Sequence, residues 1–305
     1  MILLTGASGY IGRHMLMCAK EKDITIVCTK HSSVFSFCEN VIACDLNDDR
    51  HIAKIASLEL PIECVVHLAG FVDIKIIQDD DGQLRPGSQS ISHLYNSNVS
   101  MAANLLECCL KASIKKIVFA SSQSVYGVPQ NNEPFSEYSA INPIEHYANS
   151  KFCAETIFKI AQKQGINTVV LRIPGVWGGD RKQGTVYNMV HSALRHKYIK
   201  ISSDFPLPID ILHIDEVVRA IFIAMETDYK GFNVYNISSG EPCSLEIIAE
   251  ILCELLPETK IIRKIPQPIV TMCNEKAKSE LNFNVMPLKQ RLATFIAEVK
   301  CASQA

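Results

Sequence analysis

Short runs of β-branched and other apolar residues alternate with amphipathic stretches along the first two thirds of the chain. The apolar runs predict strands at residues 2–4, 24–28, 41–43, 64–68, 116–121 and 167–172. The stretches between them carry apolar residues at helical spacing and predict helices at residues 11–22, 51–58, 97–112 and 146–164. Strands that alternate with helices in this way are typical of a parallel sheet with helices on both faces. The pattern therefore predicts an α/β fold.

The pattern changes after Arg172. Gly and Pro become frequent, the alternation of strand and helix breaks up, and amphipathic helices are predicted only at residues 247–256 and 288–299. We expect a main domain at residues 1–172, and at 173–305 a smaller lobe interleaved with late strands and helices of the main sheet. Residues 71–92 lack a clear period and predict a mobile loop over the strand ends, a kind of loop that is often functional.

Composition narrows the class of protein. The chain has 305 residues, of which 48% are hydrophobic and 20% charged, as expected of a soluble globular protein. Its net charge of -2 argues against nucleic acid or an anionic membrane as a partner. The sequence contains no apolar run of the ~20 residues that a membrane span needs, and its first residues resemble a strand and not a signal peptide. The 12 cysteines show no metal-ligand spacing, so we expect no metal site, reduced thiols and a cytoplasmic location.

The first candidate site is a glycine-rich turn. Gly6, Gly9 and Gly12 come directly after the first predicted strand and open the first predicted helix. Such a turn brings the backbone close to a pyrophosphate, whose charge is stabilised by amide N–H groups and by the helix dipole. We expect the residues of the turn to bind a dinucleotide: Gly6, Ser8, Gly9, Tyr10, Ile11, Gly12 and Arg13.

The end of the second predicted strand bears on which dinucleotide is bound. An acidic residue there would bind the ribose 2′-hydroxyl of NAD, whereas a basic residue accommodates the 2′-phosphate of NADP. This chain has Lys30 and His31 at that place and Arg13 just after the last glycine. The sequence therefore favours NADP(H), with NAD(H) as the alternative.

The second candidate site is the pair Tyr147 and Lys151. A spacing of four residues places a phenol and an ammonium group on one face of a helix. A phenol titrates near pH ~10, and a nearby cation lowers that pKa toward the range useful for acid-base catalysis. The same spacing also occurs by chance on surface helices, so the pair gains weight from the glycine turn.

Motifs along nearly the whole chain resemble the extended short-chain dehydrogenase/reductase family, the NAD-dependent epimerase/dehydratase group. The resemblance implies a Rossmann-type, doubly wound parallel sheet, with residues 1–172 binding the dinucleotide and the C-terminal lobe binding the substrate. The resemblance rests on the order and separation of the motifs, which are residues 5–12, 44–46, 67–70, Asn98, 121–127, 147–151, 171–174, 177–178, 212–217 and 235–240.

The resemblance also implies roles for single residues. Ser122 would bind the reacting oxygen, Tyr147 would be the acid-base, and Lys151 would bind the nicotinamide ribose while lowering the pKa of the tyrosine. Asp45 and Leu46 would hold the adenine ring, and Asn98 would distort its helix or hold a water. The other residues expected at the cofactor are Leu68, Ala69, Gly70 and Ile173.

The two residues directly after Ser122 narrow the reaction. Dehydratases of the family carry an acidic pair at these positions, whereas this chain has Gln123 and Ser124. Together with the basic residue at Lys30, this favours an NADPH-dependent reductase of a 4-keto nucleotide sugar. A nucleotide-sugar 4-epimerase that retains NAD is the runner-up, and a non-catalytic NADP sensor is a third reading.

A homodimer is expected from the helices that bear Asn98 and Tyr147. In the family these two helices often form a four-helix interface. Here they carry small and apolar residues, although a core face within one chain would look similar: Ala102, Cys109, Cys153, Ala154 and Ile157.

Overall fold

The chain divides into two compact units. A computed structural model describes residues 1–30, 40–57, 60–72, 76–78, 84–86, 91–129, 133–201, 210–263, 269 and 271–302. The first unit comprises Met1–Gly127, Ile141–Leu171 and Ala224–Val234, and the second comprises Val128–Ala140, Arg172–Ile223 and Tyr235–Ala305. After Leu171 the chain passes from the first unit into the second, next to the domain boundary that the sequence predicts at Arg172. That the second unit binds the substrate stays a prediction.

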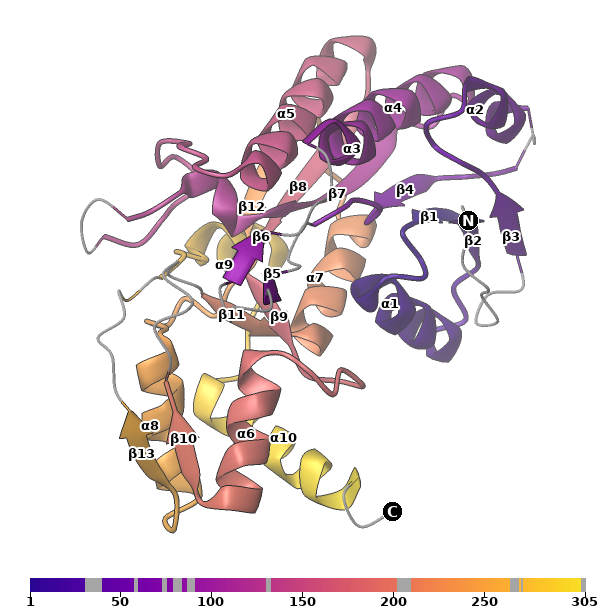
Figure 1. Cartoon of the computed structure of the whole chain (residues 1–305). Helices are drawn as coiled ribbons and strands as arrows, with labels where there is room; N and C mark the ends of the chain where they lie inside the picture. Colours follow the sequence, from indigo (N-terminus) through magenta and orange to yellow (C-terminus); the bar gives the residue numbers. More distant parts are fainter. Residues whose placement is uncertain are drawn as a thin grey trace. The chain divides into compact units, whose positions relative to one another are not determined.

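The first unit is built on a parallel sheet of seven strands in the order β12-β8-β7-β4-β1-β2-β3 (Figure 1). The chain runs from β1 outward to β3 and then returns to β4 on the other side of β1, so the strand order reverses between β1 and β4. Ligands of such sheets bind at that reversal, outside the carboxyl ends of the strands. The predicted doubly wound Rossmann-type sheet is confirmed, with strands at Ile2–Thr5 (β1), Ile26–Lys30 (β2), Asn40–Ala43 (β3), Cys64–His67 (β4), Lys116–Ser122 (β7), Asn167–Ile173 (β8) and Phe232–Asn236 (β12).

Helices cover both faces of this sheet. Helices α2 (Asp49–Ala56), α4 (Met101–Lys111) and α5 (His146–Ala161) lie side by side on one face, and α1 (Tyr10–Glu21) lies on the other. The core between α4, α5 and the strands contains Ala102, Cys109 and Ala154, each fully buried within the chain. These residues therefore carry no argument for a homodimer, which stays a prediction.

The structure differs from the sequence-based elements at two places. The helix expected at 97–112 is α4 preceded by a π-helical turn at Asn96–Ser100 and by α3 at Ile91–Tyr95. The loop expected at 71–92 contains an antiparallel pair of short strands, β5 (Ile76–Gln78) and β6 (Leu84–Pro86). A loop prediction was wrong there, because strands of three residues are too short to show a period.

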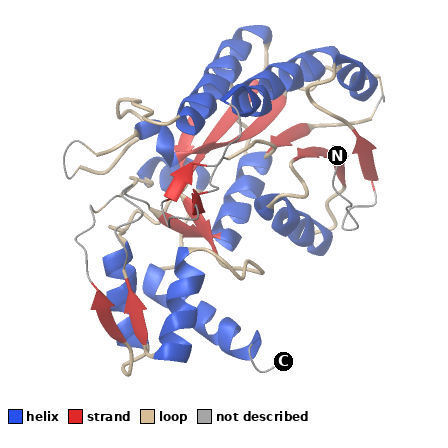
Figure 2. Ribbon diagram, in the orientation of Figure 1, coloured by secondary structure: helices blue, strands red, loops and turns tan. Residues whose placement is uncertain are grey.

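The second unit contains small parallel strand pairs and helices around its own core (Figure 2). Helices α6, α8 and α10 pack on one another over a core that includes Trp177, Val190, Leu252 and Phe295. The elements are β9 (Gly175–Trp177) paired with β11 (Ile211–His213), β10 (Tyr198–Lys200) paired with β13 (Lys260–Arg263), α6 (Thr185–His196), α7 (Ile214–Glu226, which runs on into the first unit), α8 (Leu245–Leu255), α9 (Glu275–Leu281) and α10 (Leu288–Ala302).

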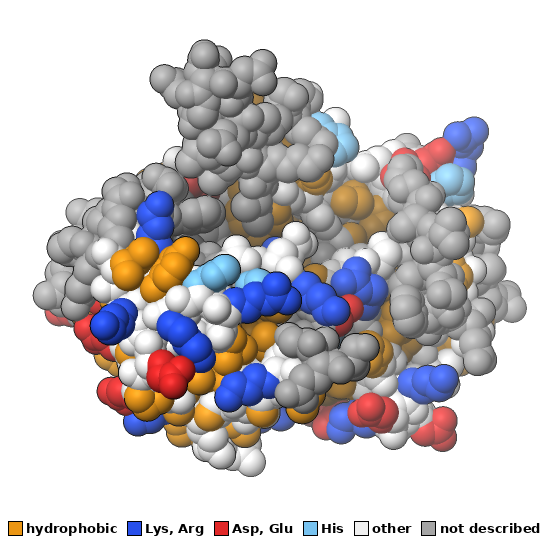
Figure 3. Space-filling view, turned by 60° about the horizontal axis from the view of Figure 1, so that its bottom comes forward, with side chains coloured by type: hydrophobic (Ala, Val, Ile, Leu, Met, Phe, Trp, Pro, Cys, Tyr) orange, Lys and Arg blue, Asp and Glu red, His pale blue; other side chains and the backbone are white. Residues whose placement is uncertain are grey.

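Charged side chains are distributed unevenly on the surface. Figure 3 shows Lys and Arg side chains in a row on one face of the molecule, next to histidines. In the second unit, Lys197 is paired with Glu258 at 3.0 Å, and both side chains are largely exposed, so the pair adds little stability. Among the residues that the structure describes, none of the helices has the length and apolar character needed to cross a bilayer.

Candidate active site

The glycine turn is held in a conformation that other residues would disturb. Gly6 has a φ of +73°, and a Cβ atom there would lie 2.5 Å from the backbone nitrogen of Ala69 at the end of β4. A Cβ atom on Gly12 would lie 2.3 Å from the Gly6 carbonyl oxygen. The turn is closed by a 3.0 Å hydrogen bond from the Gly9 amide to the Gly6 carbonyl. Glycine is therefore required at both positions for β1, β4 and α1 to pack this closely.

Helix α1 starts at this turn with its amides uncapped by a side chain. Gly9 is its N-cap residue and supplies no side-chain hydrogen bond. The first turn of a 12-residue helix therefore presents N–H groups and the positive end of the helix dipole. Ser8 and Gly9 are exposed, Tyr10 and Ile11 are half-buried in the first turn, and the Arg13 guanidinium donates to the Ser8 carbonyl at 3.2 Å. This end of the helix suits an anionic group.

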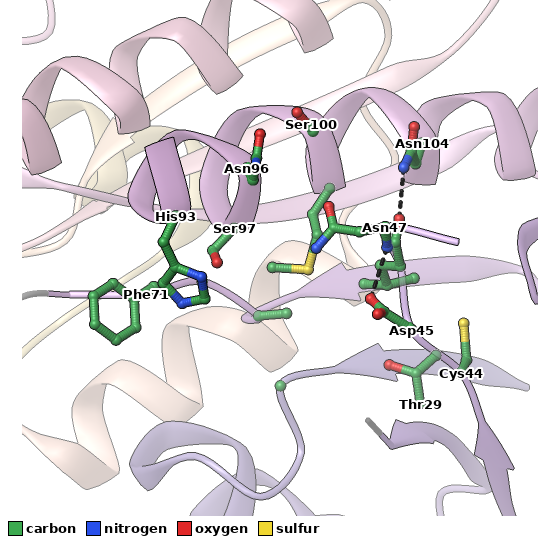
Figure 4. Close-up of a pocket in the computed structure, with 15 residues that line it drawn as sticks. Thr29, Cys44, Asp45, Asn47, Phe71, His93, Asn96, Ser97, Ser100 and Asn104 are labelled. Atoms are coloured by element: carbon green, nitrogen blue, oxygen red, sulfur yellow. Dashed lines mark hydrogen bonds between the residues drawn. The ribbon is translucent and has the colours of Figure 1, made fainter. Parts of the chain in front are cut away.

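A cavity of about 830 Å³ lies along the carboxyl ends of the first unit's strands (Figure 4). Its predicted members are Gly6, Asp45, Leu46, Ala69 and Gly70. The pattern of the sequence missed the rest, although several are direct neighbours of predicted residues: Thr29, Cys44, Asn47, Phe71, His93, Asn96, Ser97, Ser100, Met101 and Asn104.

One end of the cavity is polar. The Asp45 carboxylate accepts a hydrogen bond from the Asn47 amide at 2.9 Å, and the Asn104 side chain donates to the Leu46 carbonyl at 2.7 Å. These bonds fix the segment after β3, and the role of Asp45 and Leu46 at an adenine ring stays a prediction. Lys30 ends β2, but its side chain and His31 lie outside the described residues, so the structure does not test the NADP argument.

The other end of the cavity is formed by Phe71, His93 and the π-helical turn. Asn98 lies in that turn and is buried, with its side chain bonded to both the amide and the carbonyl of Phe71 at 2.7 and 2.9 Å. It also donates to the Ser150 hydroxyl at 2.9 Å. Asn98 thus joins the end of β4 to helix α5, but it does not line the cavity.

Ser122 and Tyr147 meet at the carboxyl end of β7. Their hydroxyl groups form a hydrogen bond in which Ser122 favours the ionised phenol. Burial acts more strongly in the opposite direction and raises the pKa of Tyr147 to about 12. Ser122 also accepts hydrogen bonds from the Ser124 hydroxyl at 2.9 Å and from the Ser124 amide at 3.2 Å.

Lys151 lies one helical turn after Tyr147 and is buried, with 6% of its surface exposed. Its ammonium group donates to the Ala120 carbonyl at 3.0 Å and lies 5.0 Å from the centre of the Phe119 ring. A Cβ atom on Gly70 would lie 3.2 Å from Lys151 Nζ, so the ammonium group lies against a residue of the cavity. Burial lowers the pKa of Lys151 to about 8, and Glu155 opposes that shift.

Comparison with known proteins agrees with this geometry. The model of the NAD dependent epimerase/dehydratase family matches residues 2–238. The chain belongs to this family. It is a family of enzymes, and the expected resemblance to extended short-chain dehydrogenases/reductases is confirmed.

Individual relatives are distant. A putative UDP-glucose 4-epimerase of Methanocaldococcus jannaschii is 25% identical over 260 residues, covering 83% of this chain and 81% of that protein. The dTDP-4-dehydro-6-deoxyglucose reductase of Escherichia coli is 26% identical and covers 98% of each chain. Among solved structures, MoeE5 in complex with UDP-glucuronic acid and NAD has a TM-score of 0.78 at 24% identity, covering 99% of each chain. This structural likeness shows the shared fold.

The site fits the dinucleotide that an NAD dependent epimerase/dehydratase uses. Gly6 and Gly12 leave no room for a Cβ atom, the α1 amides suit a pyrophosphate, and Asp45 lies at the polar end of the cavity of about 830 Å³. Gly6, Asp45 and Gly70 would hold such a cofactor. Its nicotinamide would accept or return a hydride.

One expectation drawn from the family is not met in the structure. Lys151 was expected to lower the pKa of Tyr147, but burial raises that pKa, and the opposing effect comes from the Ser122 hydroxyl. The physical reason is desolvation, which penalises the charged form of the buried phenol more than the Ser122 hydrogen bond favours it.

Two further residues expected at the cofactor lie at the ends of strands. Leu68 comes directly after β4, and its amide donates to the Thr5 carbonyl at 3.2 Å, beside the glycine turn. Ile173 ends β8 and is buried in the second unit. Among the described residues, no group of His, Cys, Asp and Glu side chains is arranged to hold a metal ion.

His67, the first residue of the predicted strand end at 67–70, is buried and supports the turn. His67 Nδ1 is hydrogen-bonded to the Thr5 hydroxyl at 2.7 Å, and the Thr5 oxygen accepts the Ala69 amide at 3.2 Å. Burial, assisted by the Lys151 charge, lowers the pKa of His67 to about 3. The neutral ring therefore links the ends of β1 and β4 beneath the cavity.

Proposed function

We propose that the protein is an NAD(P)-dependent oxidoreductase that transfers a hydride at a sugar carbon of a nucleotide sugar. The observation that carries the proposal is the joint position of three groups on β7 and α5. Ser122 is bonded to Tyr147, and Lys151 lies one turn further on, against Gly70 of the cavity. A hydroxyl pair one helical turn from a cation that lies against a residue of the cavity suits the stabilisation of charge on a reacting oxygen.

The geometry suggests a role for each of the three residues. Ser122 would donate a hydrogen bond to the substrate oxygen as charge develops on it. Tyr147 would exchange the proton of that oxygen, as a base when the carbinol is oxidised and as an acid when the carbonyl is reduced. Lys151 would fix the nicotinamide ribose from beside Gly70.

The segment after Ser122 argues against dehydration. Elimination of water needs a general acid near the leaving hydroxyl. The chain supplies Gln123 and Ser124 there, and the Ser124 hydroxyl is already directed to Ser122 at 2.9 Å. A reaction that moves a hydride and one proton is supported instead.

Among such reactions we favour 4-epimerisation with a retained NAD. The Methanocaldococcus relative is named a putative UDP-glucose 4-epimerase, and MoeE5 was solved with a UDP-sugar and NAD. An epimerase oxidises and re-reduces the same carbon, so its cofactor need not leave. Reduction of a 4-keto nucleotide sugar, which the sequence alone favours, is the second candidate. It is supported by the dTDP-4-dehydro-6-deoxyglucose reductase, whose similarity covers 98% of each chain.

The two reactions differ in what happens to the cofactor. We would release bound nucleotide from the purified protein and identify it by mass spectrometry. We would then incubate the protein with UDP-glucose, and separately with NADPH and a 4-keto nucleotide sugar. Retained NAD with interconversion of UDP-glucose and UDP-galactose is the expected result. Stoichiometric NADPH consumption with the keto sugar would favour the reductase. The absence of cofactor binding and of either reaction would refute the proposed function.

A further inference from the structure

We propose that Glu155 is a positioning residue of this centre, which keeps Lys151 charged and in place. Glu155 lies one helical turn beyond Lys151 on α5, as Lys151 lies one turn beyond Tyr147. Residues spaced by four share one face of a helix, so the three groups form a column on α5. This inference rests on the proposed function, because it matters only if Lys151 serves the cofactor.

The column on α5 is matched by three successive residues of β7. Ser121 donates a hydrogen bond to Glu155 Oε1 at 2.5 Å. The Ala120 carbonyl accepts from Lys151, and Ser122 is bonded to Tyr147. Each member of the helix column is therefore fixed by its own partner on the neighbouring strand.

The burial of Glu155 calls for a counter-charge. Only 2% of its surface is exposed, and an ionised carboxylate at such a depth is costly unless it is paired and hydrogen-bonded. Ser121 supplies a hydrogen bond but no charge. The ammonium group of Lys151, buried one helical turn away, supplies the positive charge, and Glu155 in turn favours the charged form of Lys151.

Other groups around Lys151 do not replace this carboxylate. His67 on β4 is neutral, since its pKa is lowered to about 3. Tyr147 stays protonated at neutral pH, Asn98 near Gly70 is an uncharged amide, and Phe119 offers the face of its ring. Glu155 therefore supplies the negative charge that these four neighbours lack. Without it, burial would leave Lys151 free to lose its proton nearer neutral pH.

The first test compares Glu155→Gln with Ser121→Ala at two pH values. At pH 6.5 Lys151 stays largely charged, and we expect Glu155→Gln to keep kcat/KM within about threefold of wild type. At pH 8.5 it should lose about tenfold or more, since tenfold corresponds to one pKa unit. Ser121→Ala removes the hydrogen bond but keeps the carboxylate, so its loss should be equal at both pH values. Glu155→Asp should restore the wild-type profile. An equal loss at both pH values in Glu155→Gln would overturn the proposal.

The second test needs neither cofactor nor substrate. The attraction between Glu155 and Lys151 acts while the lysine is charged and vanishes once it is neutral. Glu155→Gln should therefore lower the free energy of unfolding more at pH 6 than at pH 9, the reverse of its effect on activity. A stability deficit independent of pH would refute the proposal. Wild-type protein that binds no NAD would refute the proposed function, whereas the unfolding measurement would still decide on Glu155.

Discussion

The surroundings of Tyr147 set the pKa of its phenol. The phenol is hydrogen-bonded to Ser122, yet burial raises its pKa to about 12, so it is protonated at neutral pH. In this state it is suited to donate its proton to a carbonyl oxygen. Accepting a proton from a carbinol needs further stabilisation of the phenolate, and Ser122 is the group that already provides part of it.

We expect Tyr147→Phe to lower kcat by about 10²- to 10⁴-fold, the usual size of an acid-base contribution. The ring keeps its packing, so the unfolding temperature should change by no more than a few degrees. Steady-state assays with a nucleotide sugar and thermal unfolding measure the two effects. Near-normal turnover would contradict the catalytic role and favour a non-catalytic cofactor sensor.

Two glycines with similar positive φ values provide a matched test of the turn. Gly6 and Gly165 have φ values of +73° and +77°, but a Cβ atom on Gly6 meets Ala69 at 2.5 Å, whereas one on Gly165 meets nothing within 4 Å. Both Gly→Ala changes cost about 1 kcal/mol in backbone conformation. We expect Gly6→Ala in addition to weaken NAD binding at least tenfold, measured by fluorescence titration. Equal affinities in the two variants would show that close packing of the turn is unimportant.

At the scale of elements, Asp210 joins three segments of the second unit. Its carboxylate accepts the amides of Ile211 at 2.7 Å and Met272 at 3.3 Å, and its carbonyl accepts the amide of Gly175. Burial raises its pKa to about 7, and Glu241 adds to the shift. Because the folded state holds this proton more tightly than the unfolded chain, the stability contributed by Asp210 is present below pH ~4 and is lost as pH rises through 7.

We therefore expect Asp210→Asn to flatten the pH dependence of unfolding. The variant loses one acceptor and should be less stable than wild type at pH 5, but the difference should shrink at pH 8, where wild type holds a buried charge. Urea unfolding at both pH values measures this difference. A gap of the same size at pH 5 and pH 8 would show that Asp210 does not titrate in this range.

The elements that the sequence predicted well are those with a long, regular period. The central strands and helices α1, α2 and α5 lie within a few residues of their expected bounds, because their apolar residues keep one period along the whole element. The pattern did not predict the π-helical turn around Asn98, although the family resemblance implied that Asn98 distorts its helix or holds a water; its partners Phe71 and Ser150 are distant in sequence. The hydrogen bond of His67 was not predicted either, because its partner Thr5 lies on another strand.

At the scale of the whole molecule, the predictions from sequence relied on local motifs and set one division at Arg172, whereas the two units alternate along the chain. Glycine spacing and the Tyr147–Lys151 interval are local signals, so they can be read in order along the chain. The return of residues Ala224–Val234 to the first unit is not a local signal. It depends on side chains of β7 and β8 that form hydrogen bonds with this segment.

Lys116 on β7 forms several of the contacts with this segment. Its ammonium group donates to the carbonyls of Met225 and Thr227 at 2.6 and 2.7 Å, and it lies 4.9 Å from the centre of the Tyr229 ring. These contacts fasten the late segment to the first unit at half-buried positions. Hydrogen bonds from a charged donor contribute about 1.5–3 kcal/mol each in favourable cases, less where water competes.

We expect Lys116→Met to lower the free energy of unfolding by about 2 kcal/mol, because it keeps the apolar stem and removes both hydrogen bonds. Lys115→Met is the matched control: Lys115 is exposed, and its change should stay within about 0.5 kcal/mol. Urea unfolding measures both values, and hydrogen exchange should rise within residues 224–234 of the Lys116 variant while the glycine turn stays protected. Equal stability of the two variants, or increased exchange spread evenly over the first unit, would show that the late segment is held by its strand pairing and not by Lys116.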